Sequence, residues 1–484
     1  MPTVKIVDTT LRDGHQCLWA TRMSTAMMLP VAEKMDRSGF DVLEVMGAVQ
    51  FDTCVRFLKE DPWARLKALK ERVTRTPLQA LIRSKCALSF ELQPTDIACL
   101  WVERLMANGI DRFIAFDGLH DLDNLVDSLL HAKKLGAHTT GWLIFSQSPI
   151  HSDELYVQKA REFLDRCQVD ALMIEDTSGI LTSERAATLV PALKREIGAV
   201  SLGLHVHNLV GLAQRTQIEA VKHGVDHIYT CISPIADGNA PPSVQTTARN
   251  LRYLGYEVDL DDGLIDEVGR HFEAIAQAED KPLGRPQDFD ASNFGHQVPG
   301  GVLSNLVVQL EAAGLGHKID EVLSESTRVR EELGWPIQVT PFSQFIGVQA
   351  ALNVIEGERY KRVPNEVKKY ALGYFGKLLA PVEPEALDRI MENGSKTIPP
   401  YPGQPESALP ELRKRYPGAG EDELLLRHSF PGTLVDEMYA ATPDNRDYAF
   451  SENQVLHLIQ EIAAQSKLPH VSIEKGSMKI DLWK

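Results

Sequence analysis

The chain has 484 residues, of which 43% are apolar and 24% charged, and its formal net charge is −16. This is the composition of an ordinary globular protein long enough for two or three domains, and its acidic balance argues against nucleic-acid binding. The six cysteines include no CxxC pair, no signal-peptide pattern is visible, and no stretch approaches roughly 18 consecutive apolar residues, so we expect a cytoplasmic protein without a membrane span.

Short apolar, β-branched runs alternate with segments of helical periodicity from residue 3 to about residue 280. Eight such runs are found, at residues 5–9, 42–46, 78–83, 113–117, 141–146, 171–176, 203–207 and 227–233. Strands that alternate with helices form right-handed βαβ units and a parallel sheet, and eight units of this size form a closed barrel. We therefore predict an α/β fold, a (β/α)₈ TIM barrel over residues 1–285. A doubly wound open sheet is the alternative, but no GxGxxG motif opens the first helix.

Helical periodicity dominates after residue 285, notably over residues 303–333 and 342–392. The following stretch, 393–407, is rich in Pro, Gly and Ser and is typical of a linker. We expect a mainly helical extension over 286–392 that completes a funnel leading to the barrel. A linker and a small C-terminal domain are expected over 393–484.

Polar side chains collect at the C-terminal ends of the predicted strands, where the catalytic residues of such barrels lie. They include Arg12, Asp13 and Gln16 after the first strand, Arg83 at the end of the third, Glu175 in the sixth, and Asn239 after the eighth. Position alone leaves two interpretations of Arg83, a core residue paired with a carboxylate or a planar clamp for a carboxylate substrate. Cys17, beside the first motif, is expected to pack.

The pair His205 and His207 is the sharpest chemical feature. Residues two apart on a strand point to the same face, so both imidazoles enter the barrel mouth, where Asp13 is also expected. Two nitrogens and a carboxylate suit a borderline divalent cation such as Zn, Co or Mn. The alternative is a hydrogen-bonded pair of strand histidines. With Asp13 at another strand end, we predict a divalent-metal site formed by all three residues.

The blocks DTTLRDGHQ and HVHN resemble the DRE-TIM metallolyase superfamily. Within it, the chain resembles the carboxyltransferase domains of pyruvate carboxylase, oxaloacetate decarboxylase and transcarboxylase. The blocks that carry this resemblance follow one another in the order that these domains have: LRDGHQCLWATRM, VPGGVLSNL (298–306), VTPFSQFIGVQA (339–350) and VPNEVKKYALGYFGKLLAPVEPE (363–385). The resemblance covers residues 3–390. It implies a metal-dependent subunit that moves CO₂ between a 2-oxo acid, such as oxaloacetate or pyruvate, and biotin. Biotin-carrier and biotin carboxylase subunits are the implied partners, and we also expect a homo-oligomer, a homodimer.

The resemblance also implies roles for individual residues. It implies Asp13, His205 and His207 as the metal ligands, and Arg12, Gln16 and Arg83 as the residues that hold the 2-oxo acid. Thr340 corresponds to the hydroxyl that moves a proton between substrate and biotin. The metal and the positive donors would stabilise an enolate oxygen while a carboxyl group leaves or arrives.

Four positions depart from the family pattern. Glu175 stands where the family has a carbamylated lysine, Gln344 replaces a lysine, Ile114 replaces an arginine, and FSQS (145–148) replaces an aromatic-Thr-Gly-Asp segment. Two alternatives for a further metal ligand are therefore open. One is Glu175, directly or through water, and the other is Asn239, as in related lyases.

These departures also keep other functions open. One is a biotin-independent, metal-dependent lyase, decarboxylase or aldolase acting on a related 3-oxo or 3-hydroxy acid, and another is a non-catalytic homologue that binds partners. Lys479 in GSMKI is followed by only five residues, so we do not expect it to carry biotin. Any biotin would then arrive on a partner chain.

Overall fold

The computed structural model describes residues 2–86, 88, 91–312, 314–394, 397–442, 444, 446, 448, 470–475 and 478–483. Eight parallel strands close into a barrel in chain order, and the predicted TIM barrel is confirmed. The strands are β1 (Lys5–Asp8), β2 (Val42–Met46), β3 (Leu78–Arg83), β4 (Arg112–Phe116), β5 (His138–Ile144), β6 (Ala171–Asp176), β7 (Ser201–Val206) and β8 (His227–Thr230). Each lies within a few residues of a predicted run.

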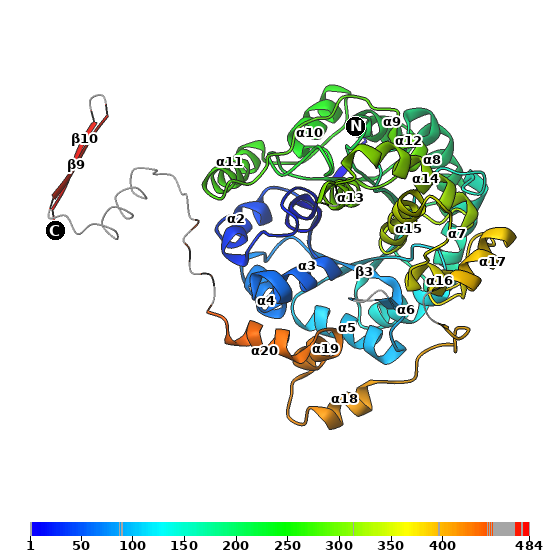
Figure 1. Ribbon diagram of the computed structural model, residues 1–484. Helices are drawn as coiled ribbons and strands as arrows, with labels where there is room; N and C mark the ends of the chain where they lie inside the picture. The colour runs from blue at the N-terminus through cyan, green and yellow to red at the C-terminus, as the bar shows by residue number, and fades with distance from the viewer. Residues whose placement is uncertain are drawn as a thin grey trace.

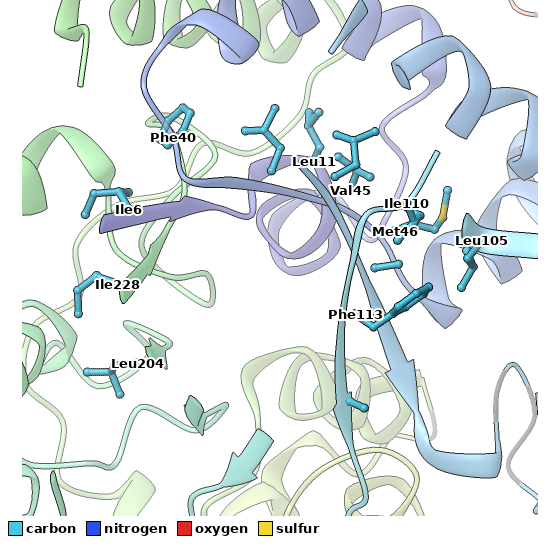
Figure 2. Close-up of a cluster of buried hydrophobic side chains, with 14 of the residues drawn as sticks. Ile6, Leu11, Phe40, Val45, Met46, Leu105, Ile110, Phe113, Leu204 and Ile228 are labelled. Carbon is cyan, nitrogen blue, oxygen red and sulfur yellow. The ribbon is translucent and has the colours of Figure 1, made fainter. Parts of the chain in front are cut away.

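The strands are recognisable because a parallel barrel buries both of their faces. Every residue of β2 and β6 is buried, although successive side chains point alternately into the barrel and towards the helices. Figure 2 shows Ile6, Val45, Phe113, Leu204 and Ile228, from five different strands, in the buried cluster that the strands share with the surrounding helices. Near-continuous apolar runs, rather than strict alternation, are the consequence.

The longer helices between and after the strands surround the barrel (Figure 1). They are α2 (Thr25–Arg37), α4 (Pro62–Arg72), α5 (Thr95–Ala107), α6 (Val126–Lys134), α7 (Asp153–Glu162), α8 (Ser183–Ile197), α9 (Ala213–Lys222), α10 (Val244–Tyr253) and α11 (Asp262–Ala278). Several begin at a side-chain cap: Ser152 accepts from the amide of Leu155, and Thr182 accepts from that of Arg185. Shorter turns complete the connections: η1 (Thr10–Gly14), α1 (His15–Leu18), α3 (Ala48–Thr53), η2 (Cys54–Leu58), η3 (Ser84–Cys86), η4 (Leu122–Asn124) and η5 (Phe163–Cys167).

The helical extension packs on the barrel through a second hydrophobic cluster. Phe342 and Ile346 of the extension share this cluster with Ile114 and Trp142, which belong to β4 and β5. The extension comprises α12 (Asn293–His296), α13 (Gly300–Ala312), η6 (Gly316–Lys318), α14 (Ile319–Glu332), α15 (Phe342–Glu356), α16 (Asn365–Ala371) and α17 (Pro384–Asn393). The extension and the barrel interior therefore share one core.

Three further helices lie on the outside of the barrel, in orange in Figure 1, and the second of them packs on α5. They are α18 (Leu409–Arg415), α19 (Glu421–Ser429) and α20 (Gly432–Ala440). Leu425 and Phe430 belong to the barrel's own hydrophobic cluster, and Arg104 Nε donates to the Asp422 carboxylate over 2.7 Å. Residues 409–440 thus share the core of the barrel, while the domain boundaries stay a prediction.

The last described elements, β9 (His470–Lys475) and β10 (Met478–Trp483), pair antiparallel in a separate two-stranded sheet. In the described part of the chain, no helix is both long enough and apolar enough to span a bilayer.

Replacing Leu425 with alanine should lower the free energy of unfolding by about 2–5 kcal/mol, since it opens a cavity at a fully buried side chain. Urea denaturation of the full chain, followed by tryptophan fluorescence, measures the change. Val308→Ala is the control, because Val308 is 63% exposed and its truncation should change stability by less than about 0.5 kcal/mol. Equal effects of the two substitutions would show that α19 does not contribute to the cooperative fold.

Candidate active site at the C-terminal ends of the strands

The turn η1 places Arg12 and Asp13 at the end of β1. Asp8 holds the start of this π-helical turn, since its carboxylate accepts from the amide and from the hydroxyl of Thr10, over 3.1 and 2.7 Å. At its end, a side chain at Gly14 would bring a Cβ atom within 2.7 Å of the carbonyl of Ile235. The sequence DTTLRDG therefore specifies the local backbone that presents Asp13 to the barrel mouth.

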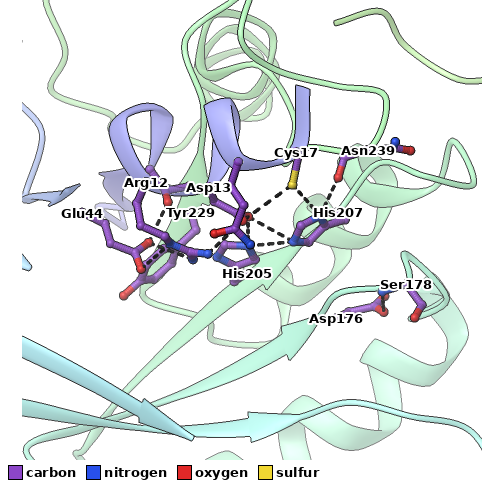
Figure 3. Close-up of polar contacts among 12 residues, drawn as sticks. Arg12, Asp13, Cys17, Glu44, Asp176, Ser178, His205, His207, Tyr229 and Asn239 are labelled. Carbon is purple, nitrogen blue, oxygen red and sulfur yellow. Dashed lines mark hydrogen bonds and ion pairs between the residues drawn. The ribbon is translucent and has the colours of Figure 1, made fainter. Parts of the chain in front are cut away.

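Asp13, His205 and His207 converge at this mouth (Figure 3). Asp13 Oδ2 lies 3.0 Å from His205 Nε2 and 3.1 Å from His207 Nε2, and the two imidazole nitrogens are 3.2 Å apart. All three residues are buried, and one ligand atom from each lies within 4.8 Å of the others. The geometry brings together two nitrogen donors and a carboxylate, the set that the sequence predicted.

The other ring nitrogen of His207 sets the chemistry of this group. His207 Nδ1 donates to the backbone carbonyl of Asn239 over 2.6 Å, which leaves Nε2 to face Asp13. Burial alone would lower the pKa of His207, but the Asp13 carboxylate raises it well above its usual value. Burial alone would likewise raise the pKa of Asp13, but Arg12 and His207 hold it well below its usual value. The site therefore attracts a positive charge at Nε2, and a divalent cation fits this donor set.

Arg12 is held in place by two carboxylates. Its Nε and Nη2 donate to the two oxygens of Glu44, over 2.7 and 3.1 Å, and Nη1 donates to Asp13 over 2.8 Å. Thr9 Oγ1 donates to the same Glu44 carboxylate over 2.6 Å. Because this network is buried, its charges are weakly screened, and it fixes the orientation of Asp13. Three N–H groups of Arg12 are thus used within the protein.

Glu175 lies next to the three residues but outside their group. It is paired in register with His205, on the neighbouring strands β6 and β7. Among the described residues, its Oε2 atom is buried without a hydrogen-bond partner, and burial raises the pKa of the carboxyl group well above its usual value. Its carboxylate is not among the ligand atoms that lie within 4.8 Å of one another. The structure thus places Glu175 beside the site with one oxygen unused.

Asn239 contacts the site through its backbone. Its carbonyl accepts from His207, whereas its amide lies against Gly300 at the start of α13. A Cβ atom at Gly300 would lie 2.3 Å from Asn239 Oδ1, so only glycine allows this approach of the extension to the loop after β8. Asn239 therefore orients His207 in this structure.

One cavity of about 430 Å³ joins the predicted residues at the C-terminal ends of the strands. Its lining includes Arg12, Asp13, Gln16, Arg83, Glu175, His207, Asn239 and Thr340, while His205 is fully buried behind it. The extension contributes Thr340 and Gln344 to the same lining. Residues more than 320 positions apart in the chain thus face one space, and polar groups suited to an anionic substrate surround it.

Gln344, one of the departures from the family pattern, lies on the side of the cavity that the extension forms. Gln344 Nε2 donates to Thr340 Oγ1 over 3.0 Å, so an amide holds the hydroxyl where the family has a lysine. In the FSQS segment, Ser146 Oγ accepts from Arg330 Nη2 over 2.7 Å and donates to Gln297 over 3.0 Å. Ile114 is fully buried in the second hydrophobic cluster. The segment after β5 is therefore bound to the extension through hydrogen bonds of Ser146, a neutral side chain, to Arg330 and Gln297.

Two functional neighbours were not predicted from the sequence. Glu44 binds Arg12, and a charged residue inside the buried run VLEVM was the available signal, since buried carboxylates need partners. Cys17, expected only to pack, places its Sγ 3.6 Å from Asp13 Oδ1 and 3.8 Å from His207 Nδ1. Its position one helical turn after Asp13 could have indicated this contact.

Two protein-family models match parts of the chain. Residues 120–271 match the HMGL-like family, and residues 294–478 match the conserved carboxylase domain. A solved structure, the carboxyl transferase domain of Rhizobium etli pyruvate carboxylase with pyruvate and biocytin, superposes with a TM-score of 0.84 at 23% identity. It covers 93% of this chain and 80% of the solved one, and this likeness concerns the fold.

Two relatives are similar over most of their length. A pyruvate carboxylase subunit of Methanocaldococcus jannaschii is 43% identical over 397 residues, which are 82% of this chain and 70% of the relative. The methylmalonyl-CoA carboxyltransferase 5S subunit of Propionibacterium freudenreichii subsp. shermanii is 34% identical over 408 residues, or 84% and 80% of the two chains. The predicted resemblance is confirmed: the chain is an enzyme of carboxyl transfer and belongs to the carboxyltransferase branch of the pyruvate carboxylase family.

Proposed function

We propose that this chain is the carboxyltransferase subunit of a biotin-dependent enzyme that acts on a 2-oxo acid of the pyruvate and oxaloacetate type. The observation that carries the proposal is the convergence of Asp13, His205 and His207 on the cavity that Arg83 and Thr340 also line. The similar pyruvate carboxylase subunit of Methanocaldococcus jannaschii supports the substrate class. The solved domain with pyruvate and biocytin supports a biotin carried by a partner chain.

The family implies a divalent metal, and the donor set of Asp13, His205 and His207 would hold an ion of the Zn, Co or Mn type. Such an ion supplies Lewis-acid polarisation of the 2-oxo oxygen. The carbonyl of Asn239 orients His207 for this role, and the carboxylates of Glu44 and Asp13 align Arg12. The protein thus contributes a preorganised, mostly buried donor set.

Substrate recognition falls to side chains on the cavity wall. Arg83 ends β3 and is only 9% exposed, so its planar guanidinium can clamp the substrate carboxylate in a weakly screened environment. Gln16 lines the same wall, and its Oε1 accepts from Gln50 over 3.2 Å. That bond leaves the Gln16 amide free to donate to an oxo acid. Together these groups orient the substrate.

Thr340 carries the proton in this proposal. In the carboxylation direction, its Oγ takes a proton from C3 of the oxo acid, and its own hydroxyl proton passes to the biotin nitrogen that loses the carboxyl group. The carboxyl group then joins C3, so one N–C bond breaks and one C–C bond forms. Gln344 donates to Thr340 Oγ1, which leaves the threonine proton available for transfer.

The effect of biotin on oxaloacetate decarboxylation by the purified chain tests this function. Free biotin should stimulate the reaction, and Thr340→Ala should abolish the stimulation, while Thr340→Ser, which keeps the hydroxyl, should retain most of it. A decarboxylase rate that responds neither to biotin nor to the loss of the hydroxyl would favour the biotin-independent lyase instead.

Glu175 is proposed to replace the family's carbamylated lysine by contacting the metal through water. Glu175→Gln should therefore weaken Zn²⁺ binding about 10- to 100-fold, the usual effect of losing such a contact. Asn239→Ala should have a smaller effect, because the carbonyl that holds His207 remains. Competition with a chromogenic chelator measures both affinities. A larger loss in Asn239→Ala would assign the ligand role to Asn239, and activity of the unmodified chain should not require bicarbonate for assembly of the site.

A further inference from the structure

A second cavity lies inside the barrel at the opposite end from the site described above. Its volume is about 240 Å³, and all eight strands contribute to its lining. The contributing residues stand at or near the starts of the strands, and among them are Lys5, Arg112, His138, Ser201 and His227, each the first residue of its strand. The cavity therefore occupies the N-terminal mouth of the barrel.

The lining of this cavity is basic. Lys5, Arg112, His138 and His227 face it, and its described lining contains no carboxylate. Asp41, just outside this lining, contacts Lys5 at 2.9 Å, Arg112 at 3.3 Å and His227 at 3.4 Å, and Asp170 acts on His138. Within the described lining itself, Lys5 and Arg112 carry permanent positive charges and no residue carries a negative one.

Further polar side chains also face this mouth. His138 Nδ1 is buried with no hydrogen-bond partner among the described residues, and Ser201 Oγ lies 2.8 Å from His227 Nδ1. The hydroxyl of Tyr229 accepts from Gln79 Nε2 over 3.2 Å and retains its own proton to donate. Donors that converge on a concave, positively charged space are the features of an anion-binding site.

We propose that the N-terminal mouth of the barrel binds a small oxyanion, a phosphate or a short carboxylate, between Arg112, Lys5 and the imidazoles of His138 and His227. The volume of about 240 Å³ accommodates such an ion with its hydration water but not a nucleotide. This site is separate from the metal-binding cavity, since the two linings share no residue in the described part of the chain.

Tyr229 connects the proposed anion site with the proposed metal-binding residues. Its side chain lines the N-terminal cavity, and its ring centroid lies 5.4 Å from that of His205. An ion held beside the tyrosine hydroxyl contacts the same side chain that packs against His205. The proposed site is therefore placed where its occupancy can be sensed by a residue of the candidate active site.

Calorimetric titration of the whole chain with inorganic phosphate, and separately with malonate, tests this site. One equivalent of at least one of the two anions should bind. Arg112→Gln should raise its Kd by about tenfold or more, as expected from losing a charged hydrogen bond. Lys5→Gln, at a half-exposed side chain, should also raise the Kd and serves if Arg112→Gln does not fold. Whichever anion binds more tightly identifies the chemical class.

Two control variants separate this site from others. Lys70→Gln removes an exposed lysine outside the cavity, paired with Asp111, and should leave the Kd unchanged. Arg83→Gln removes one of the cations of the other cavity and should also leave the Kd unchanged. The proposal is overturned if neither anion binds, or if binding is lost in Arg83→Gln and kept in Arg112→Gln and Lys5→Gln.

Discussion

The variant His207→Ala should contain less than a tenth of the metal found in the unmodified protein, and its carboxyl-transfer activity should be lost. His207 Nε2 lies 3.1 Å from Asp13 Oδ2 and 3.2 Å from His205 Nε2, so its removal takes away one of three donors. Losing a contact beyond the ligands themselves already costs about 10- to 100-fold in metal affinity, and losing a ligand should exceed this. Elemental analysis after dialysis against a weak chelator gives the metal content.

His223→Ala is the matched control for this experiment. His223 also contacts a carboxylate, Glu219 at 3.1 Å, but it lies at the end of α9, outside the cavity lining. Its loss should leave the metal content unchanged. Circular dichroism of both variants checks that they are folded. Full metal occupancy in a folded His207→Ala protein would mean that the three residues form a hydrogen-bonded cluster and the metal binds elsewhere.

The variant Arg83→Lys should raise KM for the 2-oxo acid roughly 10- to 150-fold, with a smaller change in kcat. Lysine keeps the positive charge but lacks the planar fork that binds both oxygens of a carboxylate. The expected loss is about 1.5–3 kcal/mol, the usual value for a charged hydrogen bond. Arg83 is nearly buried at the cavity wall, so solvent screens this interaction little. Steady-state kinetics of oxaloacetate decarboxylation measure both constants.

Arg104→Lys provides the comparison for Arg83→Lys. Arg104 makes a carboxylate contact of 2.7 Å to Asp422, but on the outer surface of the barrel. Its replacement should leave KM unchanged. If Arg83→Lys also leaves KM unchanged, Arg83 is a structural residue and another cation holds the substrate carboxylate.

The barrel and the position of its site could be predicted from the sequence alone. Each strand is a short apolar run because both of its faces are buried, and the helices between the runs require parallel pairing. Parallel pairing places every C-terminal strand end at the same mouth. Asp13 and His207 could therefore be assigned to one site, although 192 or more residues separate Asp13 from the two histidines.

Distances between elements were decided only by the tertiary structure. The pairing of Arg12 with Glu44, the contact of Cys17 with His207, and the packing of the Asn239 amide against Gly300 depend on side-chain packing across separate elements. No periodicity encodes such contacts. The position of Glu175 beside the group of Asp13, His205 and His207, rather than within it, depends on the same packing.

The packing of α19 on α5 and the basic mouth at the other end of the barrel also required the closed fold. The sequence around Leu425 indicates a helix but does not show that this side chain is buried in the hydrophobic cluster of the barrel. Lys5, Arg112 and His227 lie in three separate segments, and only barrel closure turns their strand starts into one positively charged cavity. The sequence by itself determined which strands form and which strand ends meet, because burial and chain direction are local properties. Only the closure of the barrel decided which charged side chains lie together and how far apart the packed side chains are, because both depend on all eight strands at once.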